Sequence, residues 1–277
     1  MAKALAKFPY ELVETSGKDA YAKWHELKTV GHGTPVILGG DESTYSNLFV
    51  PFGDNGPHIP PPPSVESILA AAERIHFPDD LIARRKADDE AARKILMDQY
   101  KNNPDPPMMT IVEADEAGHS RTLSKEETRE RMLAEPKEPE LGDWPSTPDS
   151  SPRLTVVTDI LKRTFLPKVH IALLPTDDWT EIPAYLHWGG WNDCPAPEYH
   201  VAALRSWRDR YGVELVGLSS DTLNLTAKHT PKARDEALAL AREQYVYCND
   251  LIDQGLRTYS ALAAALMAND WWFFWWD

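Results

Sequence analysis

The sequence predicts an α/β fold: a mixed sheet covered by helices on both faces, with an α+β arrangement as the alternative. Segments with strand patterns alternate with segments of helical periodicity along most of the 277 residues, which favours a layered sheet. The segment VHIALL, residues 169–174, is apolar at nearly every position, as in a strand buried on both faces. The closing stretch WWFFWWD, residues 271–277, would place aromatic side chains on both faces of a strand. We therefore expect this C-terminal aromatic strand to be central in the sheet.

Residues 1–77 are predicted to be an N-terminal α/β part of the fold. Strand patterns occur at residues 10–13 and 35–39. The helix expected between them carries apolar residues at helical spacing, namely Ala20, Trp24 and Leu27. Residues 60–63 are four prolines in a row, typical of a stiff polyproline segment, and Ser64 is the expected N-cap of the next helix.

Residues 78–152 are predicted to be a charged, proline-rich insertion of helix and loop. A highly charged helix is expected from about residue 78 to residue 100. Residues 102–152 contain eight prolines and one short strand pattern at 108–112. Such a composition cannot bury much apolar surface, so we expect a surface excursion that includes a hairpin.

Residues 153–277 are predicted to be a C-terminal α/β domain. Residues 154–165 fit a short helix or a strand, and later strand patterns occur at 169–174, 182–188, 213–218 and around Leu223 and Leu225. Pro197 suits the first turn of a helix that ends at Gly212. An alanine-rich helix capped by Thr258 leads into the final strand.

The strongest helical pattern covers residues 232–254 and has two stripes. The apolar stripe consists of Ala237, Ala241, Tyr245, Cys248 and Ile252. The polar stripe consists of Glu243, Tyr247, Asp250 and Gln254. Together with Asp221, the polar stripe is a candidate wall of a pocket, because paired acids serve acid–base chemistry or bind cations. The alternative is a solvated helix face.

Charge and composition narrow the classes of partner. The net charge of −14 repels phosphate backbones, so we expect no nucleic-acid partner. Residues 1–150 hold 27 acidic and 17 basic side chains, which is compatible with a basic protein partner. No secretory pattern and no apolar run of about 20 residues occurs. With only two cysteines, a cytoplasmic protein with reduced thiols and no membrane contact is expected.

Several unusual motifs occur together in the C-terminal half. They are "IPAYLHWGGWNDCPAPEYHVAALRSWRDRYGVELVGLSSDTLNL", "ALALAREQYVYCNDLIDQG" and "LAAAL" followed by "WWFFWWD". Their order resembles the bacterial family catalogued as domain of unknown function 4253, over about residues 169–277. The N-terminal "FPYELVETSG" and "GTPVILGG" also look like the upstream part of longer members. The resemblance implies a common fold and supplies no mechanism.

The loop between residues 188 and 195 is the first candidate site. It offers Trp188, Gly190, Asn192, Asp193 and Cys194 ahead of a helix N-terminus, where glycines permit close backbone approach and an anion can bind. The loop is either a ligand-binding or catalytic loop, or a tight turn in which Asn192 caps backbone groups.

The two cysteines suggest two more specific kinds of site, a catalytic thiol and a zinc site. Cys194 near a helix N-terminus could act as a nucleophile with His187 or His200 as its base, although no cysteine-protease signature is present. His187, Cys194, His200 and Cys248 could also bind zinc, but their spacing matches no standard site. Core thiols are the preferred interpretation, and we predict no metal and no cofactor.

Asp277 would lie at the C-terminal end of the final strand, where ligands gather in open α/β sheets; the alternative is a solvated chain end.

Two hypotheses of function follow. The first is a binding module of the bacterial cytosol, for example an immunity-type protein that binds a basic partner through an acidic surface. The second is an enzyme or a small-molecule binder, with its pocket between the 188–195 loop, Asp221, the 243–254 helix and Asp277.

Overall fold

The structure, a computed structural model, describes residues 8–40, 62–103, 111–114, 120–134, 137–159 and 161–277. The chain divides into two compact units. The larger unit comprises residues 1–78 and 139–277, and the smaller one comprises residues 79–138. The smaller unit therefore falls within the charged, proline-rich segment, and residues 139–152 belong to the larger unit.

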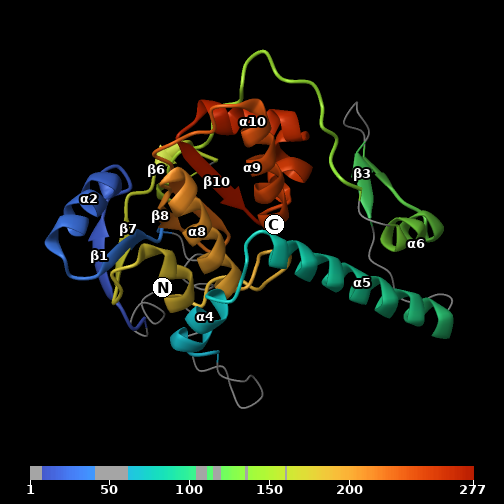
Figure 1. Cartoon of the computed structure of the whole chain (residues 1–277), viewed down its shortest axis with the longest axis horizontal. Coiled ribbons are helices and arrows are strands. Elements are labelled where there is room, and N and C mark those ends of the chain that lie inside the picture. Colours follow the sequence, from blue (N-terminus) through green and yellow to red (C-terminus); the bar gives the residue numbers. More distant parts are fainter. Residues whose placement is uncertain (1–7, 41–61, 104–110, 115–119, 135–136, 160) are drawn as a thin grey trace. The chain divides into compact units, whose positions relative to one another are not determined.

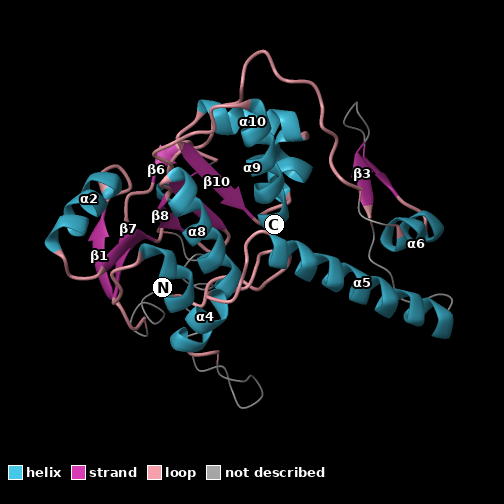
Figure 2. Cartoon of the chain, in the orientation of Figure 1, coloured by secondary structure: helices cyan, strands magenta, loops and turns pink. Residues whose placement is uncertain are grey.

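A mixed sheet forms the centre of the larger unit (Figures 1 and 2). Within the described residues its strand order is β1-β7-β2-β8-β9-β10. The strands are β1 (Glu11–Thr15), β2 (Thr34–Ile37), β7 (Val169–Leu174), β8 (Glu214–Leu218), β9 (Thr222–Thr226) and β10 (Trp271–Trp275). Strands β2 and β8 run parallel, and the other neighbours run antiparallel. The predicted α/β class with a mixed sheet is confirmed.

The described helices of the larger unit are α2 (Ala20–Val30), α4 (Val65–Ala72), α7 (Ile182–Tyr185), α8 (Pro197–Tyr211), α9 (Arg234–Tyr247) and α10 (Tyr259–Ala268). Their ends follow local chemistry. The hydroxyls of Ser64 and Thr258 accept hydrogen bonds from the first turns of α4 and α10, as N-caps do. Gly31 and Gly212 end α2 and α8 in left-handed conformations.

Three short turns and a small ladder complete the larger unit. The turns are η2 (Thr155–Val157), η3 (Trp179–Glu181) and η4 (Leu251–Leu256). The ladder pairs β5 (Thr158–Asp159) with β6 (Thr164–Phe165). Residues 154–165 thus combine a helical turn with strands, so both alternatives predicted for this segment occur side by side.

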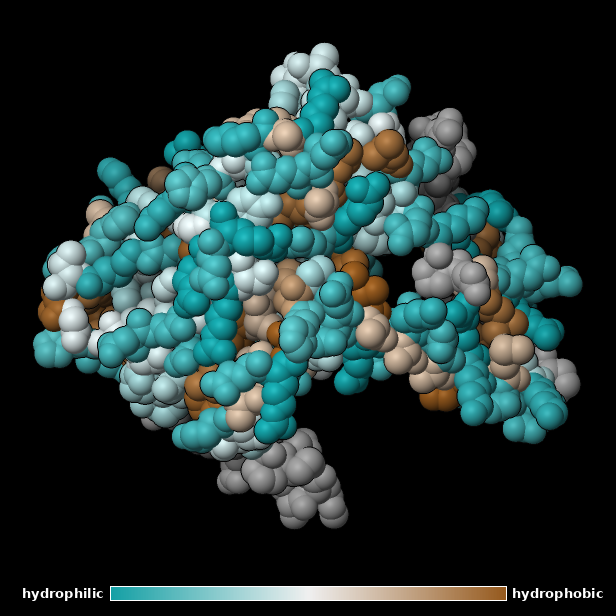
Figure 3. Space-filling model, in the orientation of Figure 1, coloured by the Kyte–Doolittle hydropathy of each residue, from teal (hydrophilic) through white to brown (hydrophobic). Residues whose placement is uncertain are grey.

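Helical elements cover the sheet on both faces. On one face, Trp24 of α2 and Val157 of η2 belong to the same buried cluster as Ile171 of β7 and Trp271 of β10. On the other face, Trp207 of α8 stacks on Phe274, with ring centroids 5.4 Å apart. Figure 3 shows mostly hydrophilic residues on the surface that it draws, as expected when such clusters hold the apolar side chains.

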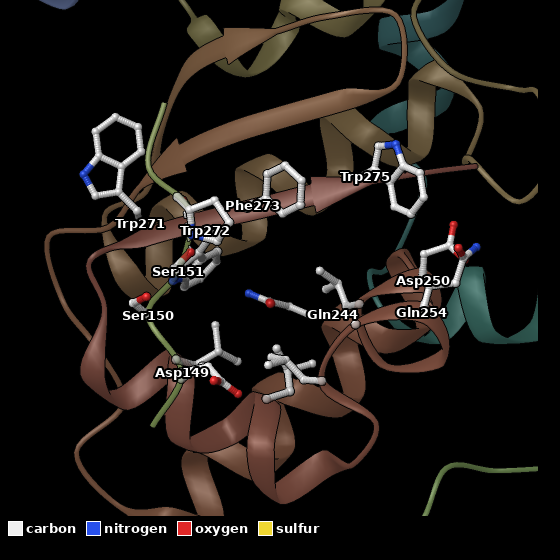
Figure 4. Close-up of a pocket in the computed structure, with 17 residues that line it drawn as sticks. Asp149, Ser150, Ser151, Gln244, Asp250, Gln254, Trp271, Trp272, Phe273 and Trp275 are labelled. Atoms are coloured by element: carbon white, nitrogen blue, oxygen red, sulfur yellow. Dashed lines mark hydrogen bonds between the residues drawn. The ribbon is translucent and has the colours of Figure 1, made fainter. Parts of the chain in front are cut away.

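The prediction of a central aromatic strand is wrong in one respect, because β10 lies at the edge of the sheet and pairs with β9. Its two-sided aromatic pattern nevertheless matches its burial: Trp271 and Trp272 are buried on opposite faces. Helices α9 and α10 follow the outer edge of the strand and supply the cover that a further strand would give (Figure 4). Burial on both faces therefore does not require a central position.

Residues 182–188 were predicted as a strand and instead form the short helix α7, which follows η3 directly. Pro183 lies in its first turn, where the missing N–H costs nothing. Ile182, Pro183 and Ala184 are all buried. A short apolar run fits a buried helical turn as well as a strand, so the pattern alone could not decide between them.

Strand β9 is buried more completely than its alternation of apolar and polar residues predicted. Asn224 is 0% exposed, and its Oδ1 accepts hydrogen bonds from the backbone N–H groups of Thr155 and Val156 at 2.9 and 3.1 Å. The buried amide therefore holds η2 against the sheet, which explains a polar residue at a core position.

The helix predicted over residues 232–254 is shorter than its pattern. Helix α9 ends at Tyr247, because Cys248 has the extended angles φ −146° and ψ 95°. The chain continues through η4, which contains the non-helical Gly255. The polar stripe is thereby split: Glu243 and Tyr247 stay on α9, while Asp250 and Gln254 lie on the segment beyond the break.

The smaller unit contains α5 (Asp79–Asn102), the hairpin strands β3 (Val112–Ala114) and β4 (Ser120–Thr122), and α6 (Lys125–Leu133). The charged helix and the hairpin were predicted, whereas α6 was not. A capping box opens α6: the Ser124 hydroxyl accepts from the Glu127 N–H, and the Glu127 carboxylate accepts from the Ser124 N–H. The predicted strand residues 108–110 and the prolines 60 and 61 lie outside the described residues.

Candidate functional site

A pocket lies along the outer edge of β10, in the larger unit (Figure 4). Its volume is about 250 Å³. Aromatic residues of β10 form one wall, and apolar residues of α10 and η4 form the opposite wall. Polar groups enter from α9, from the end of η4 and from residues 149–151. A few polar groups in an apolar hollow are the usual composition of a small-molecule site.

The backbone of β10 presents hydrogen-bonding groups toward this pocket. The Asp270 carbonyl accepts from Ala227 N–H, and Trp276 N–H donates to the Asp221 carbonyl, so the even-numbered residues face β9. Because alternate residues of an antiparallel pair point their backbone groups in opposite directions, Phe273 directs its N–H and C=O to the outer edge. The Trp275 carbonyl on the same edge accepts from the Cys248 thiol at 3.0 Å.

Gln244 is the most informative side chain of the pocket. It comes from α9, is only 2% exposed, and projects its amide into the hollow (Figure 4). Its Nε2 is buried and has no hydrogen-bond partner among the described residues. The Nε1 of Trp272, which also lines the pocket, is in the same state. Buried donors without acceptors are rare in native proteins and call for an explanation.

Carboxylates gather at the opposite end of the pocket from Asp149. Asp250 lines the pocket and accepts hydrogen bonds from Gln254 Nε2 at 2.8 Å and from the Asp277 N–H at 3.1 Å. Burial raises the pKa of Asp253, and repulsion from Asp250 and Asp193 raises it further, against the lowering effects of the Tyr245 hydrogen bond and the Arg257 charge. This end of the site is therefore electronegative.

The structure brings five of the sequence-predicted site residues together around this carboxylate end. Besides Asp250 and Gln254, these are Asn192, Asp193 and Asp277. Asn192 Nδ2 donates to the Asp277 carbonyl at 2.8 Å, and Asp193 accepts from Asn249 Nδ2 at 3.2 Å. Asp250 and Gln254 line the pocket itself, whereas the other three do not.

Three other predicted residues have structural partners close to this group. Trp188 is buried and donates from Nε1 to the Ser219 carbonyl at 2.7 Å. Gly190 closes the 188–195 turn through its N–H, which donates to the Pro195 carbonyl at 2.8 Å. The Asp221 carboxylate accepts from the hydroxyls of Ser219 and Thr222. These contacts make the loop a tight turn that holds the end of β10.

Glu243 and Tyr247 lie apart from the pocket. Glu243 forms an ion pair with Arg210 and accepts a hydrogen bond from Trp207 Nε1 at 3.3 Å. Tyr247 is 0% exposed, and its ring packs edge-on against that of Phe274 at 5.0 Å. Both side chains therefore tie α9 to α8 and the sheet instead of lining the pocket.

Cys194 does meet the histidine predicted as its base. Its Sγ lies 3.4 Å from His200 Nε2, and His200 Nδ1 lies 2.5 Å from the Tyr247 hydroxyl. Burial raises the pKa of Tyr247 strongly, with added repulsion from Cys194 and Cys248. Cys194, His200 and Tyr247 are all buried, and none of them lines the pocket. The candidate nucleophile therefore lies beside a base but is not accessible from the pocket.

The structure does not bring the four predicted zinc ligands together in one site. His187 Nε2 lies 2.8 Å from the Pro63 carbonyl, and Cys248 donates to Trp275, as noted above. Cys194 and Cys248 are both reduced thiols. Within the ranges that the structure describes, no three His, Cys, Asp or Glu side chains are grouped to hold a metal ion.

The sequence-based search missed Gln244, residues 149–151 and the apolar wall of α10. One signal was available for Gln244. It follows Ala237 and Ala241 on the apolar stripe of α9, so a polar side chain there had to be buried. Residues 149–151 carried no such signal, because only the tertiary fold brings them beside β10.

Fold and site together define an α/β domain with a ligand-sized pocket at the edge of its sheet. Residues 170–277 match the model of the family described as "Domain of unknown function (DUF4253)". This part of the chain is a domain of that family, as its motifs predicted. No curated protein and no solved structure matches the chain. Among the described helices, none is both long and apolar enough to cross a membrane.

Proposed function

We propose that the DUF4253 domain is a binding module whose pocket takes a small ligand with an apolar body and a hydrogen-bond acceptor. The observation that carries this proposal is Gln244, a buried amide that projects an unpaired donor into an apolar hollow. Leaving such a donor without an acceptor costs about 1–3 kcal/mol. A ligand carbonyl placed opposite Nε2 would recover that free energy.

The pocket suits a compact ligand. An engineered apolar cavity of about 150 Å³ binds benzene, and this pocket of about 250 Å³ has room for one ring and a short polar chain. The outward-facing N–H and C=O groups of Phe273 offer further hydrogen bonds along the strand. We assign no catalytic step, because among the described residues that line the pocket no nucleophile is hydrogen-bonded to a base.

A direct test uses N-benzylacetamide, a neutral probe with one ring and one amide carbonyl. Titration into the full-length protein is followed through the indole N–H signals in ¹H–¹⁵N spectra, where Trp271, Trp272 and Trp275 report on the pocket. We expect these signals to shift in a saturable way. If only signals from tryptophans outside the pocket move, or if none moves, the proposal fails.

Three variants show where the ligand binds. Gln244→Met removes the donor while keeping the shape, and should weaken binding roughly fivefold without lowering the stability of the free protein. Ala265→Phe fills the pocket from α10 and should abolish binding. Ala268→Phe lies on the same helix at an exposed position and is the control that should leave binding unchanged.

A second candidate function is the binding of a basic protein partner, as an immunity-type protein would do, in the bacterial cytoplasm. The net charge of −14 favours it. A complex isolated from source cells at low salt should contain a basic polypeptide that 0.5 M NaCl releases, because exposed charge pairs are screened. Recovery of the protein alone under both conditions would contradict this candidate.

A further inference from the structure

The charge around the pocket narrows the class of ligand. Asp250 is the carboxylate that lines the pocket near Trp275 (Figure 4). Both of its hydrogen-bond donors, Gln254 Nε2 and the Asp277 N–H, are neutral. Within the described part of the chain, no lysine, arginine or histidine forms an ion pair with it. A carboxylate that faces an apolar hollow without a cation leaves a place for one.

Neighbouring carboxylates strengthen this field. Asp193 and Asp250 both act on Asp253 and raise its pKa, after the effect of burial. Asp193 has a neutral donor, Asn249. Arg257 is the cation that acts against them: it lowers the pKa of Asp253, and its guanidinium donates to the Asp253 backbone carbonyl. Arg257 thus acts on Asp253, while Asp250 is the carboxylate that faces the pocket.

The walls of the pocket accept the rest of such a ligand. Trp275 and Phe273 are both partly exposed at the pocket, and aromatic rings attract ammonium groups as well as apolar bodies. Gln244 stands farther along the pocket, with its free donor directed inward. The pocket therefore offers places for three parts of a ligand in order along β10: a cation at Asp250, an apolar body at Trp275 and Phe273, and a hydrogen-bond acceptor at Gln244.

We propose that the ligand is an amine: its ammonium group binds Asp250, its apolar body lies along β10, and its acceptor meets Gln244. The inference rests on the proposed function above and adds the charge of the ligand. Two observations of different kind support it: Asp250, which lines the pocket and has only neutral hydrogen-bond donors, and the buried Gln244 donor that points to a ligand. An anionic ligand of the same size would meet Asp250 with like charge.

Three matched probes test which ligand charge the pocket prefers. N-(4-(aminomethyl)benzyl)acetamide carries an ammonium group on the far side of its ring from the amide, N-benzylacetamide is neutral, and 4-(acetamidomethyl)benzoic acid carries a carboxylate in place of the ammonium group. All three share the ring and the amide. At pH 6.5 and low salt we expect the amine to bind about tenfold more tightly than the neutral probe. We expect the acid to bind more weakly than both.

Asp250→Asn locates the effect. It should remove most of the preference for the amine over N-benzylacetamide, measured as the ratio of the two affinities. Asp235→Asn removes a carboxylate at an exposed position on α9 and should keep the full preference. If the neutral probe binds in the pocket but the amine gains nothing, the amine inference is overturned and the proposed function stands. If no probe binds, both fall.

Discussion

The two faces of β10 give the sharpest prediction on the fold. Phe274 is 0% exposed, and its ring lies 5.4 Å from that of Trp207, 5.0 Å from that of Tyr247 and 6.2 Å from that of Trp276. Phe273, the next residue, is on the opposite face and only partly buried, beside the pocket. Replacing each by alanine therefore separates the core face of the strand from its ligand face.

The expected losses of folding stability in Phe274→Ala and Phe273→Ala differ severalfold. Truncating a buried phenylalanine to alanine typically costs about 3–5 kcal/mol of stability, and with three ring partners Phe274→Ala is expected to cost about 4 kcal/mol. Phe273 loses only part of its burial, so about 1 kcal/mol is expected. For a unit of this size, each kcal/mol lowers the melting temperature by about 2–4 °C, so Phe274→Ala should lower it by about 8–16 °C.

The free energy of unfolding of both variants is measured by urea unfolding. Far-ultraviolet circular dichroism follows the transition, because that signal depends less than fluorescence on the ten tryptophans. Equal slopes with denaturant would show that the unfolding transition itself is unchanged. Phe273→Ala should additionally weaken the binding of N-benzylacetamide. Equal losses of stability in the two variants, or a loss below about 1 kcal/mol for Phe274→Ala, would refute the assignment of faces.

Three further predictions concern local chemistry. Burial raises the pKa of Asp178, but hydrogen bonds from Thr180 and Arg208 outweigh it, so its pKa is lowered overall. The ionised Asp178 therefore stabilises the fold above the ordinary pKa of about 3.9, and this contribution is lost as the pH falls through the lower folded value. Asp178→Asn should cost about 1 kcal/mol at pH 7, and its difference from the parent protein should close in acid; a constant difference would contradict this. Ser124→Ala should cost about 1 kcal/mol and speed amide exchange at the start of α6, whereas unchanged exchange would show that the capping box contributes nothing. Gly189→Ala would place a Cβ 2.2 Å from the Pro195 carbonyl oxygen at a φ of +114°, so it should destabilise by more than about 2 kcal/mol. Gly190→Ala, whose nearest neighbour is 4.0 Å away, is its control and should cost less.

The 188–254 region shows how far sequence patterns reach toward the candidate site. The glycine-containing loop ahead of a helix pointed to Asn192 and Asp193, and the structure places them with Asp250 and Gln254 around one end of β10. Helical spacing singled out Asp250 and Gln254. It also singled out Glu243, because an unbroken helix would align it with Asp250. The break at Cys248 removes that alignment, and at this break the Cys248 thiol donates to the carbonyl of Trp275, 27 residues later.

The sequence by itself determined what depends on neighbours along the chain. Alternation and helical spacing predicted most strands and helices, Ser64 and Thr258 predicted helix starts, and Gly212 predicted a helix end, because propensities, caps and turns act within a few residues. The aromatic pattern of residues 271–276 likewise predicted burial on both faces.

The tertiary structure decided what covers those faces. Strand β10 is at the edge of the sheet, with α9 and α10 beside it. Strand neighbours and helix cover bury apolar surface equally well, so the sequence pattern could not distinguish them. The pocket exists because this cover is incomplete: helices cannot pair with the outward-facing groups of Phe273, and the space between them holds the amide of Gln244.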